Sequence, residues 1–72
     1  MKRFQVKEYG FGELAQLYYP DRSYKDALRR FREELRQTTR LSQALRRIGY
    51  KGNERVLTRN QVRVIVQYLG DP

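Results

Sequence analysis

The spacing of apolar residues along the chain predicts four helices. In four stretches, hydrophobic side chains recur three or four positions apart, as on one face of an α-helix. Pro20 ends the first stretch, Thr38 or Thr39 caps the third, and Gly49 ends the third. Two shorter stretches have the character of strands and are expected to pair as a minor two-stranded ribbon. The predicted helices cover residues 11–19, 23–37, 38–48 and 59–69, and the predicted strands cover residues 4–7 and 55–57.

Local signals at the predicted helix ends support these boundaries. Ser23 and Thr58 are favoured N-cap residues, and Asp26 and Gln61 follow them at the three-residue spacing of a capping box. Gly49 suits the left-handed conformation that ends a helix in a Schellman motif. The sequence therefore predicts one mainly α domain over residues 1–72, with a small winged-helix-like ribbon at most.

Composition excludes several function classes. The chain has no Cys and no His, so disulfides and thiolate or zinc-finger metal sites are excluded, and no cofactor is expected. Its carboxylates are scattered and no Gly-rich phosphate loop is present, so we expect no enzyme and no small-molecule substrate. The sequence shows no signal peptide and no membrane span, and a small chain without disulfides is most simply cytoplasmic.

The net charge is the strongest indication of a partner. Sixteen Lys and Arg face eight Asp and Glu, which gives +8, and twelve of the sixteen are Arg. This imbalance favours an anionic partner, because it otherwise destabilises the fold through self-repulsion. Arg binds phosphate through a planar bidentate fork, which points to nucleic acid. The alternative is that the charge only keeps a small protein soluble.

The excess charge is concentrated on the second predicted helix. Four basic residues fall within about 60° of one another around the helix axis: Lys25, Arg29, Arg32 and Arg36. We call these four residues the basic stripe. Neighbours within the stripe repel each other, and Arg32 has no acid three or four positions away. The alternative is a solvated face whose ion pairs join Asp26 to Arg30 and Arg30 to Glu34.

The first two predicted helices suggest a helix-turn-helix-like core that binds duplex DNA. The first would brace the second, which would enter the major groove. An ordinary helical hairpin remains the alternative, because the turn is long and contains Pro20. The DNA prediction assigns contacts with phosphates or bases to nine residues: Arg22, Ser23, Lys25, Arg29, Arg32, Arg36, Arg40, Arg46 and Arg47.

Two further surfaces have open interpretations. Lys51, Asn53 and Arg55 lie in a predicted turn that is either a small wing touching phosphates or an ordinary connection. A second set on the last helix, Gln61, Val64 and Tyr68, either packs against another element or mediates homodimerisation. These three residues favour the alternative to DNA binding, which is a protein-interaction adaptor or self-associating module that needs no nucleic acid. Membrane-surface binding ranks third, because the core requires the apolar face of the second helix.

The whole chain also resembles a known family. The pattern YG-x-x-ELA-x-LY at residues 9–18 and the pattern LT-x-x-QV…LG-D-P at residues 57–72 are similar to short proteins from Bacteroides and relatives, catalogued as domain of unknown function 4248. Asp71 replaces the family's usual Glu, and Glu34-Leu35 replaces a common Trp-Ile pair. The resemblance implies a stand-alone domain without an appended enzyme, and it assigns no site residues.

Overall fold

The four predicted helices are all present in the computed structural model, which describes residues 4–72. Their ends lie within about two residues of the predicted ends, the usual uncertainty of such boundaries. The chain is mainly α-helical, with one small two-stranded sheet, as predicted. In chain order the elements are β1 (Tyr9–Gly10), α1 (Phe11–Tyr18), α2 (Tyr24–Gln37), α3 (Thr39–Arg47), β2 (Val56–Leu57) and α4 (Arg59–Leu69).

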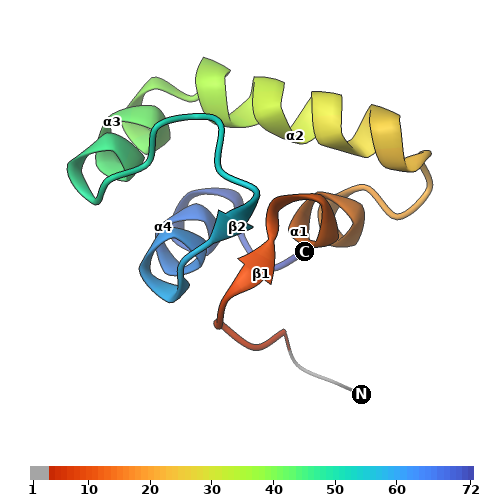
Figure 1. Ribbon diagram of the computed structural model, residues 1–72, viewed down its shortest axis with the longest axis horizontal. Helices are drawn as coiled ribbons and strands as arrows, with labels where there is room; N and C mark the ends of the chain where they lie inside the picture. The colour runs from red at the N-terminus through yellow and green to blue at the C-terminus, as the bar shows by residue number, and fades with distance from the viewer. Residues whose placement is uncertain (1–3) are drawn as a thin grey trace.

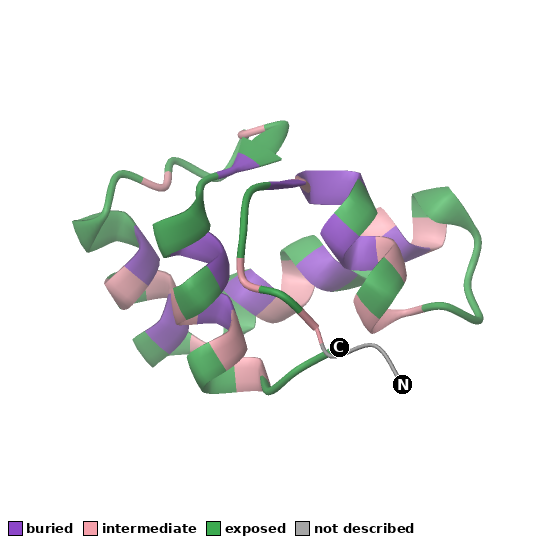
Figure 2. Cartoon of the chain, turned by 90° about the horizontal axis from the view of Figure 1, so that it is seen from below, coloured by how far each residue is buried: buried purple, intermediate pink, exposed green. Residues whose placement is uncertain are grey.

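The longest helix, α2, runs along one side of the molecule, with α1 and α4 on the other side and α3 at its C-terminal end (Figure 1). The molecule measures 31 × 25 × 19 Å. Buried positions lie on the inner faces of the helices (Figure 2). The largest fully buried side chains come from all four helices and from β2, so they form one core: Leu14, Phe31, Leu41, Leu45, Leu57, Val62 and Ile65.

Phe31 of α2 holds α1 and α2 together. Its ring centroid lies 5.1 Å from that of Phe11 and 5.4 Å from that of Tyr18. Ala15 and Ala27 are also fully buried, and their small side chains let the two helices pack closely. Burying a side chain of the size of Phe stabilises a fold by about 1.5–3 kcal/mol. The packing fixes the rotation of α2 about its axis and leaves the basic stripe exposed.

Gly49 ends the third helix as predicted. Its φ is +92°, its N–H donates to the carbonyl of Arg46 at 3.1 Å, and the N–H of Tyr50 donates to the carbonyl of Leu45 at 3.0 Å. These two bonds define a Schellman motif. The motif turns the chain sharply after α3 and sends it back toward α2.

Of the two predicted capping boxes, the one at α4 is complete and the one at α2 has only one of its two hydrogen bonds. At the start of α4, Thr58 Oγ1 accepts from the Gln61 N–H at 3.2 Å, and Gln61 Oε1 accepts from the Thr58 N–H at 2.9 Å, so this capping box is confirmed. At the start of α2, Ser23 Oγ accepts from the Asp26 N–H at 3.3 Å. The reciprocal bond is missing there, because the Asp26 carboxylate binds arginines instead.

The strand predicted at residues 4–7 is wrong. The first strand is β1, which pairs antiparallel with β2 so that Tyr9 lies opposite Leu57. The ring of Phe4 stacks on that of Tyr9, with centroids 5.4 Å apart, and the Tyr9 hydroxyl donates to the carbonyl of Gln5 at 2.9 Å. The alternating apolar and polar residues at positions 4–7 therefore form a coil, and this coil packs against Tyr9 of β1.

The predicted strand at residues 55–57 is confirmed as β2. The two strands are not consecutive, because all of α1, α2 and α3 lies between them. Their pairing is therefore not a hairpin, and it joins segments near the two ends of the chain. Within residues 4–72 no helix has the length and apolar character needed to cross a membrane.

Candidate nucleic-acid interface

The basic stripe is exposed along its whole length. All four of its side chains are exposed, and they lie about 130° around α2 from the centre of its buried face. The direction pointing straight away from the core is shared by Arg29 and Glu33. The positive charge of α2 therefore lies mainly on its flank, and its outermost ridge is partly acidic.

Asp26 neutralises part of this charge. Its Oδ1 lies 2.6 Å from Arg29 Nη2 and its Oδ2 lies 2.8 Å from Arg22 Nη1. Hydrogen bonds from Arg22 and then from Arg29 lower the pKa of the Asp26 carboxyl below its ordinary value. The predicted ion pair of Asp26 with Arg30 is thus wrong, because the carboxylate is taken by Arg22 and Arg29. Two of the nine predicted contact residues are paired in the free protein.

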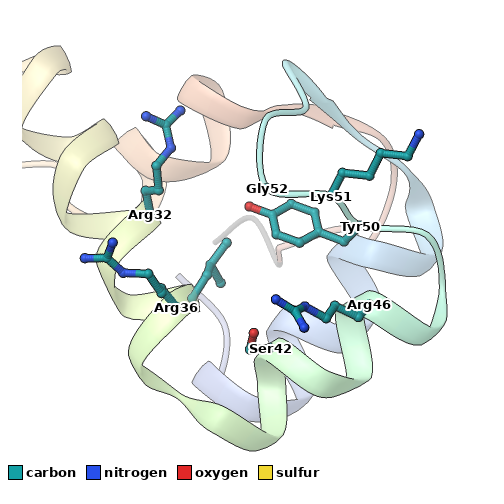
Figure 3. A pocket seen from close by; sticks show the side chains of 8 residues that line it. Arg32, Arg36, Ser42, Arg46, Tyr50, Lys51 and Gly52 are labelled. Atoms are coloured by element: carbon teal, nitrogen blue, oxygen red, sulfur yellow. The ribbon is translucent and has the colours of Figure 1, made fainter.

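A pocket of about 320 Å³ lies between α2, α3 and the loop that follows α3 (Figure 3). We call it the cationic pocket, because four of its eight lining residues are Arg or Lys and none is acidic. Leu35, which is almost fully buried, forms part of its wall. The lining residues are Arg32, Leu35, Arg36, Ser42, Arg46, Tyr50, Lys51 and Gly52.

Local backbone structure brings these residues together. Thr38 is both the C-cap of α2 and the N-cap of α3, so the two helices meet at a corner without a loop. The Schellman motif at the end of α3 then returns Tyr50 toward α2. In Figure 3 the side chains of Ser42, Arg46 and Tyr50 point into the pocket, and the Lys51 amine points away from it.

Arg32 lies where the stripe and the pocket meet. Among the described residues it has no acidic partner, and its guanidinium carbon lies 5.3 Å from the centroid of the Phe11 ring. An aromatic face stabilises such a cation by about 0.5–1 kcal/mol at an exposed site. Arg32 and Arg36 also line a shallow groove along α2 together with Lys25, Arg29 and the acidic Glu33. The stripe and the cationic pocket are therefore one continuous surface.

The loop after α3 is held by Glu54. Its carboxylate accepts from the backbone N–H groups of Lys51 at 2.6 Å, Gly52 at 2.9 Å and Asn53 at 3.1 Å. Burial acts to raise the pKa of Glu54, but these backbone hydrogen bonds outweigh it and lower the pKa. The loop therefore has a defined shape, with its acid turned onto its own backbone.

The structure separates the predicted contact residues into groups. It brings Arg32, Arg36 and Arg46 together with Lys51 at the cationic pocket. Ser23 caps α2 at its far end, near Arg22. The contact with nucleic acid predicted for all of these residues stays a prediction. Five further predicted residues are exposed but do not line the pocket: Lys25, Arg40, Arg47, Asn53 and Arg55.

Sequence reasoning missed four of the eight pocket residues, and two of these, Ser42 and Tyr50, carry hydroxyl groups. Ser42 lies four positions before Arg46, on the same side of α3, and this spacing was available as a signal. Tyr50 is half-buried, and its position depends on the turn at Gly49. Burial first, and then the charge of Glu54, raise the pKa of Tyr50, so its hydroxyl keeps its proton and can donate.

The surface predicted for self-association is mostly covered. Gln61 is 4% exposed and serves the capping box of α4. Val64 is half-buried and packs against the core, and only Tyr68 is well exposed. These three residues therefore do not form a free apolar patch. Within residues 4–72, no group of three or more acidic side chains is close enough to hold a metal ion.

Comparison with protein families gives one result. A family model described as Domain of unknown function (DUF4248) matches residues 5–72. The chain belongs to this family. The match includes every helix, both strands and the whole cationic pocket. No curated protein and no solved structure matches the chain.

Proposed function

We propose that this DUF4248 domain binds duplex DNA, without catalysis, through the surface formed by the basic stripe and the cationic pocket. The observation that carries the proposal is the convergence of cations from three elements. Arg32 and Arg36 of α2, Arg46 of α3 and Lys51 of the following loop line one hollow that contains no acidic residue. Phosphate contacts would neutralise these charges and release counterions, which is the main source of affinity for DNA.

Such a domain would contact the DNA backbone more than the bases. Glu33 lies near the outermost ridge of α2 and lines the groove beside the basic stripe, so it would be repelled by the phosphates deep in a DNA groove. The basic flank is better placed to follow one strand of phosphates, with α1 bracing α2 in a helix-turn-helix-like manner. Under this proposal the domain acts as a regulator in the cytoplasm, on a target that its base contacts would define.

A salt-dependent titration tests the proposal. A fluorescent duplex of about 20 base pairs is titrated with protein from about 50 to 200 mM KCl, and anisotropy gives the affinity. We expect the double variant Arg32→Ala/Arg36→Ala to weaken binding at least about tenfold at low salt. Its slope of log affinity against log salt should be lower by about 1.8, since each lost phosphate contact removes about 0.9.

Two arginines on α4 provide the matched control. Arg59 and Arg63 are exposed and line neither the groove nor the pocket, so Arg59→Ala/Arg63→Ala removes the same charge elsewhere. The control should lose much less affinity. Absence of wild-type binding at low salt would overturn the proposal, and equal losses in both double variants would show that only net charge matters.

A further inference from the structure

We infer that the cationic pocket is a binding site for a phosphomonoester, the dianionic phosphate group carried by a small phosphorylated molecule or by the 5′ end of a nucleic-acid strand. The inference goes beyond binding to the duplex backbone, because it concerns a terminal phosphate inside the pocket. It stands whether or not the basic stripe binds duplex DNA.

The charge and shape of the pocket favour a terminal phosphate. A backbone phosphodiester carries one negative charge and is flanked by sugars on both sides, whereas a phosphomonoester carries nearly two charges at neutral pH and ends the molecule. Four cationic side chains and no acidic one line the pocket, and the Arg46 guanidinium points into it. Its volume of about 320 Å³ is in the range of small-ligand sites, and its concave form suits a group that enters end-on.

The donors of the pocket match phosphate oxygens in kind. The Arg46 guanidinium and the hydroxyls of Ser42 and Tyr50 come from α3 and the turn after it, and all point inward (Figure 3). Arg32 and Arg36 of α2 line the rim of the pocket, with their guanidinium groups turned outward (Figure 3). A guanidinium binds phosphate with two parallel hydrogen bonds, and a hydroxyl adds a neutral donor at low cost of desolvation.

The nearest acid does not compete for these donors. Glu54 influences the pKa of Tyr50 and so lies near the pocket, but it is not a lining residue. Its carboxylate accepts three hydrogen bonds from the backbone N–H groups of Lys51, Gly52 and Asn53. The pocket donors therefore remain available for an external anion.

The aromatic and apolar wall adds room for the rest of the ligand. Leu35 is buried beside the pocket, and the half-buried Tyr50 ring lies across from α2. A base or another planar group attached to the phosphate can stack against such a ring, as bases do on aromatic side chains in single-strand binding proteins. A phosphorylated molecule with a planar group is thus expected to bind more tightly than inorganic phosphate.

The first experiment locates and measures binding of inorganic phosphate by NMR. Titration of ¹⁵N-labelled protein should shift the amides of Tyr50 and Gly52 in a saturable way. Arg46→Ala should weaken binding about tenfold, the loss of a bidentate charge-assisted contact. Arg47→Ala is the matched control, because Arg47 follows directly in α3, carries the same charge and does not line the pocket. Equal weakening in the two variants would overturn the inference.

The pH dependence tests the preference for a dianion. The chain has no His, and Arg and Lys keep their charge between about pH 5.5 and 7.5. The charged and titratable groups that line the pocket are Arg32, Arg36, Arg46, Lys51 and Tyr50, and Glu54 beside it has a lowered pKa. Only the phosphate itself, with a second pKa near 6, therefore gains charge over this interval. Phosphate should bind several-fold more tightly at the higher pH, while sulfate, a dianion throughout, should not change. A flat phosphate response would overturn the dianion preference.

Two further arms distinguish the sources of the phosphate. Adenosine monophosphate is compared with adenosine, and a 5′-phosphorylated duplex with the same duplex ending in a 5′-hydroxyl. Tight binding of the nucleotide indicates a small ligand, and a gain only with the phosphorylated duplex indicates a strand end. If neither phosphate adds affinity while the 5′-hydroxyl duplex still binds, this inference fails and the proposed function stands. If phosphate binds and neither duplex binds, this inference stands and the proposed function fails.

Discussion

Asp26 controls how much of the charge on α2 is free for a partner. Its carboxylate binds Arg22 and Arg29, the latter at 2.6 Å, so one member of the basic stripe is already paired. Because the carboxylate is exposed to solvent and its pairs are surface ion pairs, these pairs contribute little to stability. Their effect is greater on binding, since a phosphate must compete with Asp26 for Arg29.

Asp26→Asn is therefore expected to strengthen duplex binding. The change frees Arg29 and raises the net charge from +8 to +9. We expect affinity to rise a few-fold at low salt and the salt slope to steepen by about 0.9, one additional phosphate contact. Glu8→Gln changes the charge equally, but Glu8 is exposed before β1 and lines neither the groove nor the pocket. An equal gain in both variants, measured by the same anisotropy titration, would show that Asp26 has no specific role.

The ion pairs of Asp26 could not be predicted from the sequence, although the basic stripe could. The basic stripe followed from helical spacing alone, because it involves only one helix. The same spacing allows Asp26 to pair with residues three or four positions away, and it does not rank Arg29 against Arg30. Arg22 lies before the helix, where no helical rule applies. Side-chain conformations and the shape of the preceding turn decide this pairing, and neither is encoded by periodicity.

At the scale of elements, the end of α3 shapes the pocket, and its glycine can be tested. Gly49 has φ +92°, and a Cβ there would meet no atom within 4 Å. Gly49→Ala should therefore cost only the backbone strain of the left-handed conformation, about 1–2 kcal/mol. For a domain of this size the melting temperature should fall by roughly 4–8 °C per kcal/mol. Gly49→Asn should lose less, because Asn tolerates this conformation. Unchanged melting in Gly49→Ala would contradict the assignment.

The helices were predictable and the first strand was not, for a physical reason. Each helix repeats its apolar spacing over eight or more residues, and the caps at Ser23, Gly49 and Thr58 mark ends independently. β1 has two residues, too few to show a period. The alternating segment before it packs Phe4 on Tyr9 without forming a ladder, so its pattern resembled a strand. Short strands depend on tertiary pairing, which periodicity does not detect.

At the scale of the whole molecule, the cationic pocket depends on how α2, α3 and the next loop meet. Arg32, Arg36 and Arg46 were identified one by one from charge, but their convergence requires the corner at Thr38 between the two helices. Tyr50 enters only through the turn that follows α3. The sequence therefore predicted much of the surface and none of its concavity, because concavity arises from contacts between elements.

A hydrogen bond between α1 and the residue after α4 also stabilises the fold, and its contribution depends on pH. The Tyr18 hydroxyl in α1 donates to the carbonyl of Gly70, just after α4, at 2.6 Å. Burial first, and then the charges of Asp71 and Tyr19, raise the pKa of Tyr18 from 10.0 to about 12. The folded protein thus holds the Tyr18 proton at pH values where the unfolded chain releases it.

Because the folded-state pKa of Tyr18 is the higher one, its contribution is complete below about pH 10 and is lost as the pH rises toward 12. The free energy of unfolding should fall by about 1 kcal/mol over this interval, after allowance for screening at a half-exposed group. Tyr18→Phe should be less stable at neutral pH but should lack this loss. Urea unfolding of both proteins at several pH values measures the difference, and Tyr68→Phe, at an exposed position, controls for general alkaline effects. A constant difference between wild type and Tyr18→Phe from pH 8 upward would show that the bond to Gly70 does not hold the Tyr18 proton.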